Sequence, residues 1–130
     1  KPMPTAESWQ LSNAAVFNMA AHRASLDIFD EVGMHALAEK SLHLTGYAEM
    51  LLKSLTNLKF QIITPEDSTQ RGCQLSLLFK SKGKETFEAL KKASIIADWR
   101  EPNVIRIAPV PLYNSFEDVY TFCEIMKHVK

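Results

Sequence analysis

The sequence has 130 residues, of which 46% are hydrophobic and 23% are charged, a composition typical of one soluble globular domain. Fifteen basic residues balance fifteen acidic ones, so the charge does not favour a nucleic acid or an anionic membrane as a partner. No apolar run reaches the roughly 18 residues that a membrane-spanning helix needs, and we therefore expect a cytoplasmic protein.

The cysteines and histidines show no metal-binding spacing. Cys73 and Cys123 lie far apart inside apolar patterns and form no C-x-x-C pair. The four histidines form no H-x-x-x-H pair that could hold a metal from one face of a helix. We therefore expect reduced cysteines that pack in the core, and no metal site.

The first residues differ in character from the rest of the chain. Prolines and small polar residues fill the segment 1–13 before any periodicity begins, and the sequence starts at Lys1 without a methionine. We interpret 1–13 as a segment that leads in from a preceding domain absent from the sequence. Residues 14–130 are then predicted to form one small domain.

Two helices are predicted next. Ser12 and Asn13 are residue types that cap helices, and they precede a segment of helical apolar spacing that ends near Val32. A second apolar stripe at three- and four-residue spacing runs from Met34 to Leu55, and a stripe of that length must face a sheet or another helix.

Beyond these helices the period changes. Strands are predicted at 60–64, 73–79, 95–97 and 104–108, with a turn at 80–84, a short helix around 87–93 and a polar turn at 98–103. A last helix begins at Ser115, where Asp118 three residues on indicates a capping box. This order predicts an α+β fold, in which a small, mainly antiparallel sheet has helices packed on one side.

Arg106 is the residue with the clearest functional implication. Alternation places Ile105 on one face of its strand and Arg106 on the other. Burying the charge unpaired would be costly, so we expect an anion to contact it. That anion is either an internal carboxylate, from Asp98, Glu101 or Asp118, or the carboxylate of a substrate held by the planar guanidinium.

Other polar residues allow two interpretations. Ser12 and Asn13 either cap a helix or bind an anion such as phosphate at its N-terminus. Arg71 and Gly72 are typical of a turn before a strand. The lysines lie in turns, at termini or on polar helix faces, so none is predicted to have the desolvated surroundings that an amine nucleophile needs at neutral pH.

Several segments together resemble kynureninases across nearly the whole chain. They are Trp9–Asn13, Ala24–Phe29, Arg71–Leu75, Ile96–Pro102 and Arg106–Phe116. The last is the most specific, because no generic strand-to-helix turn demands a run of eleven residues with two prolines and an arginine.

The resemblance implies the C-terminal small domain of a fold-type I enzyme that uses pyridoxal 5'-phosphate (PLP). In the family, a larger preceding domain anchors PLP through a lysine, and a homodimer shares the active site. The resemblance implies that Arg106 holds the α-carboxylate of the substrate. It also implies that Ser12 lies close to the cofactor phosphate, and Asn13 close to both the phosphate and the substrate ring. This chain departs from the family in having Ala14 and Ala15 where prolines are common.

The implied reaction is the hydrolysis of L-kynurenine or 3-hydroxykynurenine to anthranilate or 3-hydroxyanthranilate and L-alanine, a step of tryptophan catabolism. No catalytic residue is expected within this chain, which by itself should be inactive. Two alternatives stay open. The chain could be a non-catalytic α+β module for ligand binding or dimerisation, with Arg106 holding a regulatory anion, or the small domain of another fold-type I PLP enzyme.

Overall fold

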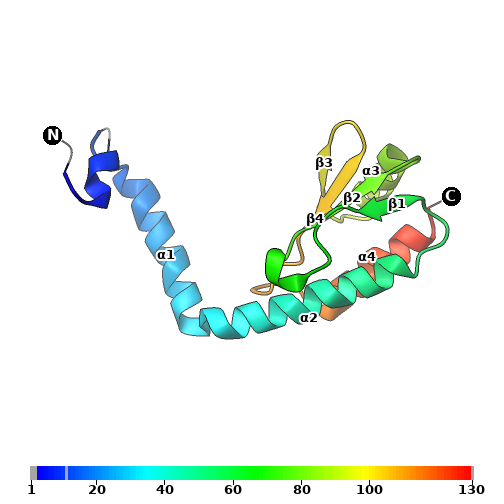
Figure 1. The fold of residues 1–130 in the computed structure, drawn as a ribbon, viewed down its shortest axis with the longest axis horizontal. Coiled ribbons are helices and arrows are strands. Elements are labelled where there is room, and N and C mark those ends of the chain that lie inside the picture. The colour runs from blue at the N-terminus through cyan, green and yellow to red at the C-terminus, as the bar shows by residue number, and fades with distance from the viewer. Residues whose placement is uncertain (1–2, 11, 130) are drawn as a thin grey trace. The chain divides into compact units, whose positions relative to one another are not determined.

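The structure is a computed structural model that describes residues 3–10 and 12–129. Lys1, Pro2, Leu11 and Lys130 lie outside the described residues, and with them parts of the predicted leading segment. The chain divides into two compact units, residues 1–34 and 35–130 (Figure 1). The domain boundary predicted after residue 13 stays a prediction.

The described part of the first unit is helical and has no core of its own. It contains the short 3-10 helix η1 (Ala6–Trp9) and the helix α1 (Val16–Val32), neither of which has a buried residue. The predicted cap at Ser12 and Asn13 is wrong, because α1 begins at Val16 and is preceded by Ala15, which makes no side-chain capping bond. The end at Val32 is confirmed. Gly33 follows with φ +84°, a conformation that glycine adopts without strain.

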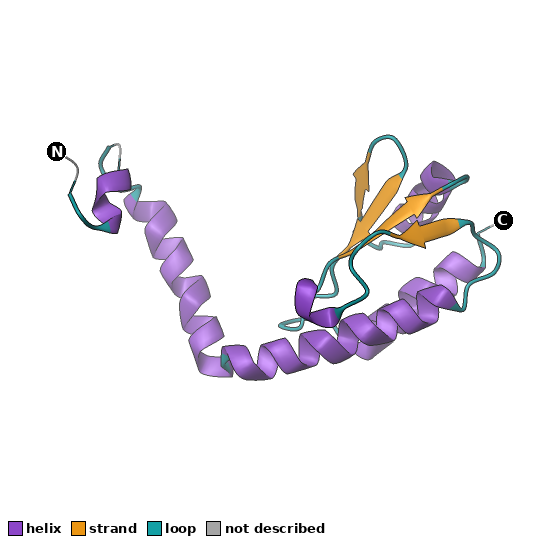
Figure 2. Cartoon of the chain, viewed as in Figure 1, coloured by secondary structure: helices purple, strands orange, loops and turns teal. Residues whose placement is uncertain are grey.

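The second unit is built on a four-stranded sheet (Figure 2). Its strands in spatial order are β1 (Phe60–Ile62), β2 (Leu75–Phe79), β4 (Val104–Ile107) and β3 (Asp98–Arg100). Every neighbouring pair is antiparallel. The predicted α+β fold with a small antiparallel sheet is therefore confirmed.

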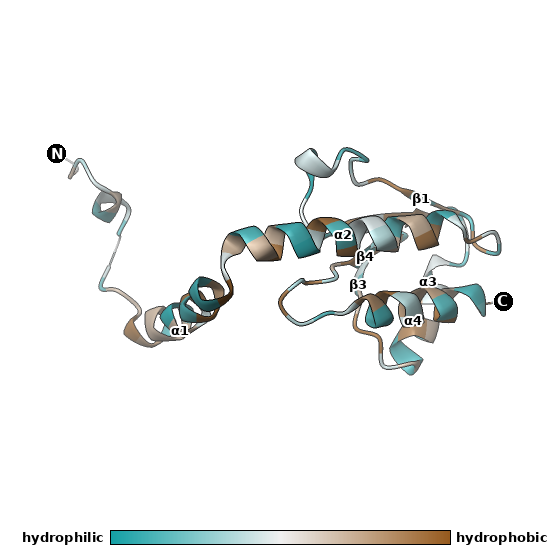
Figure 3. Ribbon diagram, turned by 90° about the horizontal axis from the view of Figure 1, so that it is seen from below, coloured by the Kyte–Doolittle hydropathy of each residue, from teal (hydrophilic) through white to brown (hydrophobic). Residues whose placement is uncertain are grey.

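Three helices cover one face of this sheet. They are α2 (Met34–Lys53), α3 (Gly83–Lys92) and α4 (Phe116–Lys127). Leu52 of α2, Leu90 of α3 and Met126 of α4 join Leu77 and Ile105 of the sheet in a single buried cluster. Hydrophobic and hydrophilic residues alternate along α2 and α4 in Figure 3, as expected of helices with one buried face.

One strand lies at a different position from the predicted one. The prediction of a strand at 95–97 is wrong, because Ile96 is fully exposed and the paired segment is β3. Pairing of Trp99 with Ile105 decides the register, and Trp99 packs against the core. Apolar composition predicts a strand at 95–97. The true strand contains the charged residues Asp98 and Arg100, which lie on the other face of the sheet from Trp99.

Gly83, predicted to lie in a turn, is the first residue of helix α3. The predicted turn at 80–84 is therefore too long, since α3 starts at Gly83. A Cβ at this position would lie 2.9 Å from the Cβ of Phe79, closer than side chains pack. Glycine thus lets the first turn of α3 approach the end of β2.

The start of α4 is as predicted. Ser115 Oγ accepts a hydrogen bond from the Asp118 N–H at 3.1 Å, and Asp118 Oδ2 accepts one from the Ser115 N–H at 2.8 Å. This reciprocal pair is a capping box with aspartate as its acidic member. It fixes where the connection from β4 ends.

Candidate functional site

Arg106 lies on the sheet face opposite the helices. Its neighbour Ile105 is completely buried in the core, and alternation turns the next side chain of β4 to the other face. In the sheet register Arg106 is paired with Ser76 of β2 and with Asp98 of β3. Its side chain is 33% exposed, so a ligand can reach it within the second unit.

Asp98 is the internal partner of Arg106. Its Oδ2 accepts hydrogen bonds from Arg106 Nε, at 2.6 Å, and from Arg106 Nη2. The same oxygen accepts a hydrogen bond from Arg100 Nε at 2.9 Å. The hydrogen bond from Arg106 is the main reason why the pKa of Asp98 is lowered below its usual range. The ion pair to Asp98 considered from the sequence is therefore present.

The other two carboxylates considered from the sequence have different roles. Glu101 Oε1 accepts a hydrogen bond from Trp99 Nε1 at 2.8 Å. Asp118 closes the capping box of α4, and the hydrogen bond from the Ser115 N–H lowers its pKa. Neither of them pairs with Arg106, whose one carboxylate partner among the described residues is Asp98 on the neighbouring strand.

The ion pair leaves part of the Arg106 guanidinium available. A guanidinium has five N–H donors, and Asp98 contacts only the edge formed by Nε and Nη2. Across residues 3–10 and 12–129 no further hydrogen bond to the Arg106 side chain is found. The edge formed by Nη1 and Nη2 can take a second carboxylate with two parallel hydrogen bonds. An internal ion pair and a ligand clamp are thus compatible at this residue.

The segment after β4 folds into a closed turn. The Val110 N–H donates to Asn114 Oδ1 at 2.9 Å, and the Asn114 N–H donates to the Val110 carbonyl at 2.8 Å. Lys40 Nζ of α2 donates to the Pro111 carbonyl at 2.7 Å. A cavity of about 440 Å³ lies beside this turn, and Pro109 and Asn114 form part of its largely apolar wall. The two-proline motif therefore shapes a pocket directly after the strand that carries Arg106.

Ser12 and Asn13 belong to the first unit. Both are exposed, and they precede the N-cap of α1 by two to three positions. Arg106 belongs to the second unit. A shared site for these three residues therefore stays a prediction.

Arg71 has a larger structural role than the predicted turn. Its side chain is 6% exposed, and its Nη2 lies 2.5 Å from Glu49 Oε2. Its Nη1 donates to the Pro65 carbonyl at 3.1 Å. Arg71 thus ties the loop between β1 and β2 to the C-terminal part of α2.

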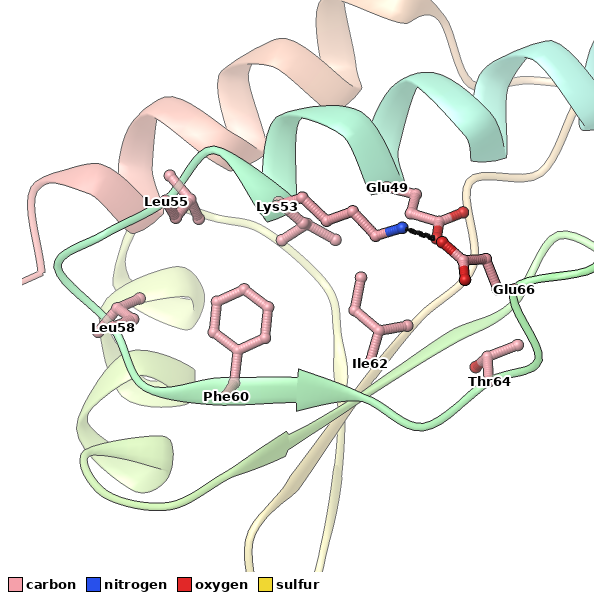
Figure 4. A pocket seen from close by; sticks show the side chains of 9 residues that line it. Glu49, Lys53, Leu55, Leu58, Phe60, Ile62, Thr64 and Glu66 are labelled. Atoms are coloured by element: carbon pink, nitrogen blue, oxygen red, sulfur yellow. Dashed lines mark hydrogen bonds and ion pairs between the residues drawn. The ribbon is translucent and has the colours of Figure 1, made fainter.

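Lys53 extends this pair into a network (Figure 4). Its Nζ lies 2.8 Å from Glu49 Oε1 and 2.6 Å from Glu66 Oε1. Figure 4 shows these charges at one end of a pocket whose apolar part includes Phe60 and Ile62. Burial favours a raised pKa for Glu49, but hydrogen bonds from Lys53 and Arg71 outweigh it and lower the pKa.

The sequence indicates only one of the ion pairs of Glu49, the pair with Lys53. Glu49 and Lys53 stand at the i, i+4 spacing that forms ion pairs on helices. Arg71 lies 22 residues from Glu49, and nothing in the spacing indicates that the loop returns to α2.

The remaining candidate chemistry is limited. In the part of the chain that the structure describes, no three His, Cys, Asp or Glu side chains gather as a metal site would require. No helix there is long and apolar enough to cross a membrane. Cys73 and Cys123 are both free. Cys123 packs in the core as predicted, and burial raises its pKa to about 11. The prediction is wrong for Cys73, which is only partly buried and lies outside the core cluster.

Comparison with known proteins decides the family. The model of the family described as "Kynureninase C-terminal domain" matches residues 37–126. The chain belongs to this family. Kynureninase of Christiangramia forsetii is 49% identical over 130 residues, and that of Xanthomonas euvesicatoria is 52% identical over 126 residues. These alignments cover 98% and 95% of this chain.

The same relatives are much longer than this chain. The alignments cover 31% and 30% of the two kynureninases, so the chain spans about a third of their length. The predicted resemblance is confirmed for the C-terminal domain of the family.

The described lysines do not fit the covalent attachment of PLP. All of them are exposed except Lys40, which is half-buried and already bonded to the Pro111 carbonyl. A lysine that forms an imine at neutral pH needs a desolvated or cationic environment to lower its pKa. The described lysines of this kynureninase domain therefore do not fit the anchoring of the cofactor.

Proposed function

We propose that this chain is the small domain of a kynureninase that hydrolyses L-kynurenine or 3-hydroxykynurenine to an anthranilate and L-alanine. The observation that carries the proposal is the free edge of the Arg106 guanidinium, in a domain of the kynureninase family. The chain alone is inactive in this proposal, and the complete enzyme works as a cytoplasmic homodimer.

Arg106 binds and orients the substrate in this proposal. Its Nη1 and Nη2 donate to the α-carboxylate and so fix the rotation of the amino acid about its Cα. Holding a reacting group in one orientation is worth several kcal/mol of the barrier. Bound PLP, anchored upstream of this domain, supplies the electron sink for the cleavage.

Ser12 and Asn13 are proposed to complete the site from the first unit. The Ser12 hydroxyl donates a hydrogen bond to the cofactor phosphate, and Asn13 contacts the phosphate and the substrate. Their exposure leaves both side chains available for such contacts. Neither residue transfers a proton in this proposal, so the chain contributes binding and orientation only.

Substitution of Arg106 in a complete kynureninase that carries this domain tests the proposal. We expect Arg106→Ala to lower kcat/KM for L-kynurenine about 100-fold, because a charge-assisted bidentate contact is lost. Arg106→Lys should recover only part of the activity, since an ammonium cannot reproduce the planar fork.

Steady-state kinetics of anthranilate release provide the measurement. Lys127→Ala is the matched control, because it removes another half-exposed cation from an ion pair on α4 and should leave kcat/KM unchanged. An Arg106→Ala enzyme with the kcat/KM of the unsubstituted protein would contradict the proposed function.

A further inference from the structure

The partners of Arg106 form a small charge cluster on one sheet face. Asp98 is 47% exposed and lies between two arginines, Arg106 at 33% and Arg100 at 59% exposure. One oxygen, Oδ2 of Asp98, accepts from both arginines. The sheet fixes this arrangement, because Asp98 and Arg106 are register partners on neighbouring strands.

The charge of this cluster matches a single carboxylate. Two guanidinium groups and one carboxylate leave a net charge of one positive unit, since arginine stays protonated. A substrate α-carboxylate brings one negative charge and neutralises the cluster. Asp98 alone therefore does not saturate the site, and a second anion can join without displacing it.

The geometry assigns Asp98 as a positioning residue for the substrate. We propose that Asp98 holds Arg106 by its Nε and Nη2 edge and thereby presents the Nη1 and Nη2 edge to the substrate carboxylate. This inference rests on the proposed function of Arg106. It adds a residue that acts through Arg106 and does not itself touch the substrate.

The physical reason is the flexibility of arginine. An unrestrained arginine side chain loses rotamer entropy when it is fixed by a ligand. Contact with Asp98 fixes the side chain before the substrate binds, so that less entropy is lost in the binding step. Both charges are partly exposed, so their attraction is screened by water and orientation is the larger effect.

Kinetics of Asp98→Ala in the complete kynureninase test this role. We expect KM for L-kynurenine to rise about tenfold while kcat changes less than about threefold, because Arg106 is still present to hold the carboxylate once the substrate is bound. The KM of Asp98→Asn should lie between those of the unsubstituted enzyme and Asp98→Ala, since its amide oxygen can still accept a hydrogen bond from Arg106. Glu124→Gln, which breaks an ion pair on α4, is the matched control and should change neither constant.

A substrate analogue separates positioning from a general structural role. The analogue is the amine that corresponds to L-kynurenine without its α-carboxylate, measured as a competitive inhibitor. Because it has no group for Arg106 to hold, its inhibition constant should be the same in the Asp98→Ala and unsubstituted enzymes. Equal weakening of the amine and of L-kynurenine would show a structural role and overturn the inference.

Two further outcomes are informative. A lower KM in Asp98→Ala would mean that Asp98 competes with the substrate, which contradicts positioning. An unchanged KM in Asp98→Ala, together with a large loss of kcat/KM in Arg106→Ala, would refute the positioning role of Asp98 and leave the proposed role of Arg106 intact. Only normal activity in Arg106→Ala would remove the proposed function as well.

Discussion

Two arginines of the second unit meet carboxylates in different ways. Arg71 is almost fully buried and is bonded both to Glu49 and to the Pro65 carbonyl. Arg106 is partly exposed and uses one edge for Asp98. A buried guanidinium with a buried partner holds elements together, whereas a partly exposed one with a free edge is available to a ligand. We therefore infer a structural role for Arg71, and the free edge of Arg106 supports the proposed binding role.

Substitution of Glu49 should reveal the structural role of Arg71. We expect Glu49→Gln to lower the free energy of unfolding by about 3 kcal/mol, because it leaves a buried guanidinium without a charged partner. Lys53→Ala removes a largely exposed member of the same network and should cost less than about 1 kcal/mol. Urea unfolding at pH 7 measures both. Equal costs would contradict the distinction.

The lowered pKa of Glu49 makes this contribution pH-dependent. A carboxyl whose pKa is lower in the folded state stabilises the protein above its ordinary pKa, here 4.5. That stabilisation is lost as the pH falls from 4.5 through the folded-state pKa. The stability difference between the unsubstituted protein and Glu49→Gln should therefore shrink below pH 4.5. A difference that stays constant down to pH 3 would be inconsistent with the ion pair.

At the scale of elements, local chemistry determines some boundaries and pairing determines others. The start of α4 is visible in the sequence because Ser115 and Asp118 bond each other across one helical turn. The position of β3 is not visible, because it depends on which residues pair with Ile105 across the sheet. Ser12 and Asn13 do not cap α1, which begins at Val16, three residues beyond Asn13.

The capping box of α4 should contribute measurably to stability. Ser115→Ala removes the acceptor for the Asp118 N–H, and we expect a loss of about 1 kcal/mol in the free energy of unfolding. Ser54→Ala serves as a control, because Ser54 is exposed and bonds the Leu51 carbonyl after the end of α2. Urea unfolding that gives the same small loss for both variants would argue against the cap.

At the scale of the whole molecule, the sequence predicted the fold class and the family, and also Arg106 with its alternative partner Asp98. It could not predict that the ion pair to Asp98 leaves one edge of the Arg106 guanidinium free, because that depends on which edge Asp98 contacts. Apolar residues of α1, such as Val16 and Phe17, are exposed and contribute nothing to the described hydrophobic core. The relatives are about three times as long as this chain.

A labelling experiment tests the division of roles between this domain and the rest of the enzyme. The 130-residue chain, mixed with PLP and reduced with borohydride, should carry no stoichiometric label on a single lysine. The reason is that the described lysines are exposed or already bonded. Mass spectrometry of proteolytic peptides is the measurement. One fully labelled lysine would place the cofactor anchor within this chain.

The most direct test of the central claim pairs Arg106 with the substrate carboxylate in a double-mutant cycle. Binding of L-kynurenine and of the amine without the carboxylate is compared in the unsubstituted and Arg106→Ala forms of the complete kynureninase. We predict that the unsubstituted enzyme prefers L-kynurenine about 100-fold and that Arg106→Ala loses nearly all of this preference. An equal preference in the two enzymes would show that Arg106 does not hold the carboxylate.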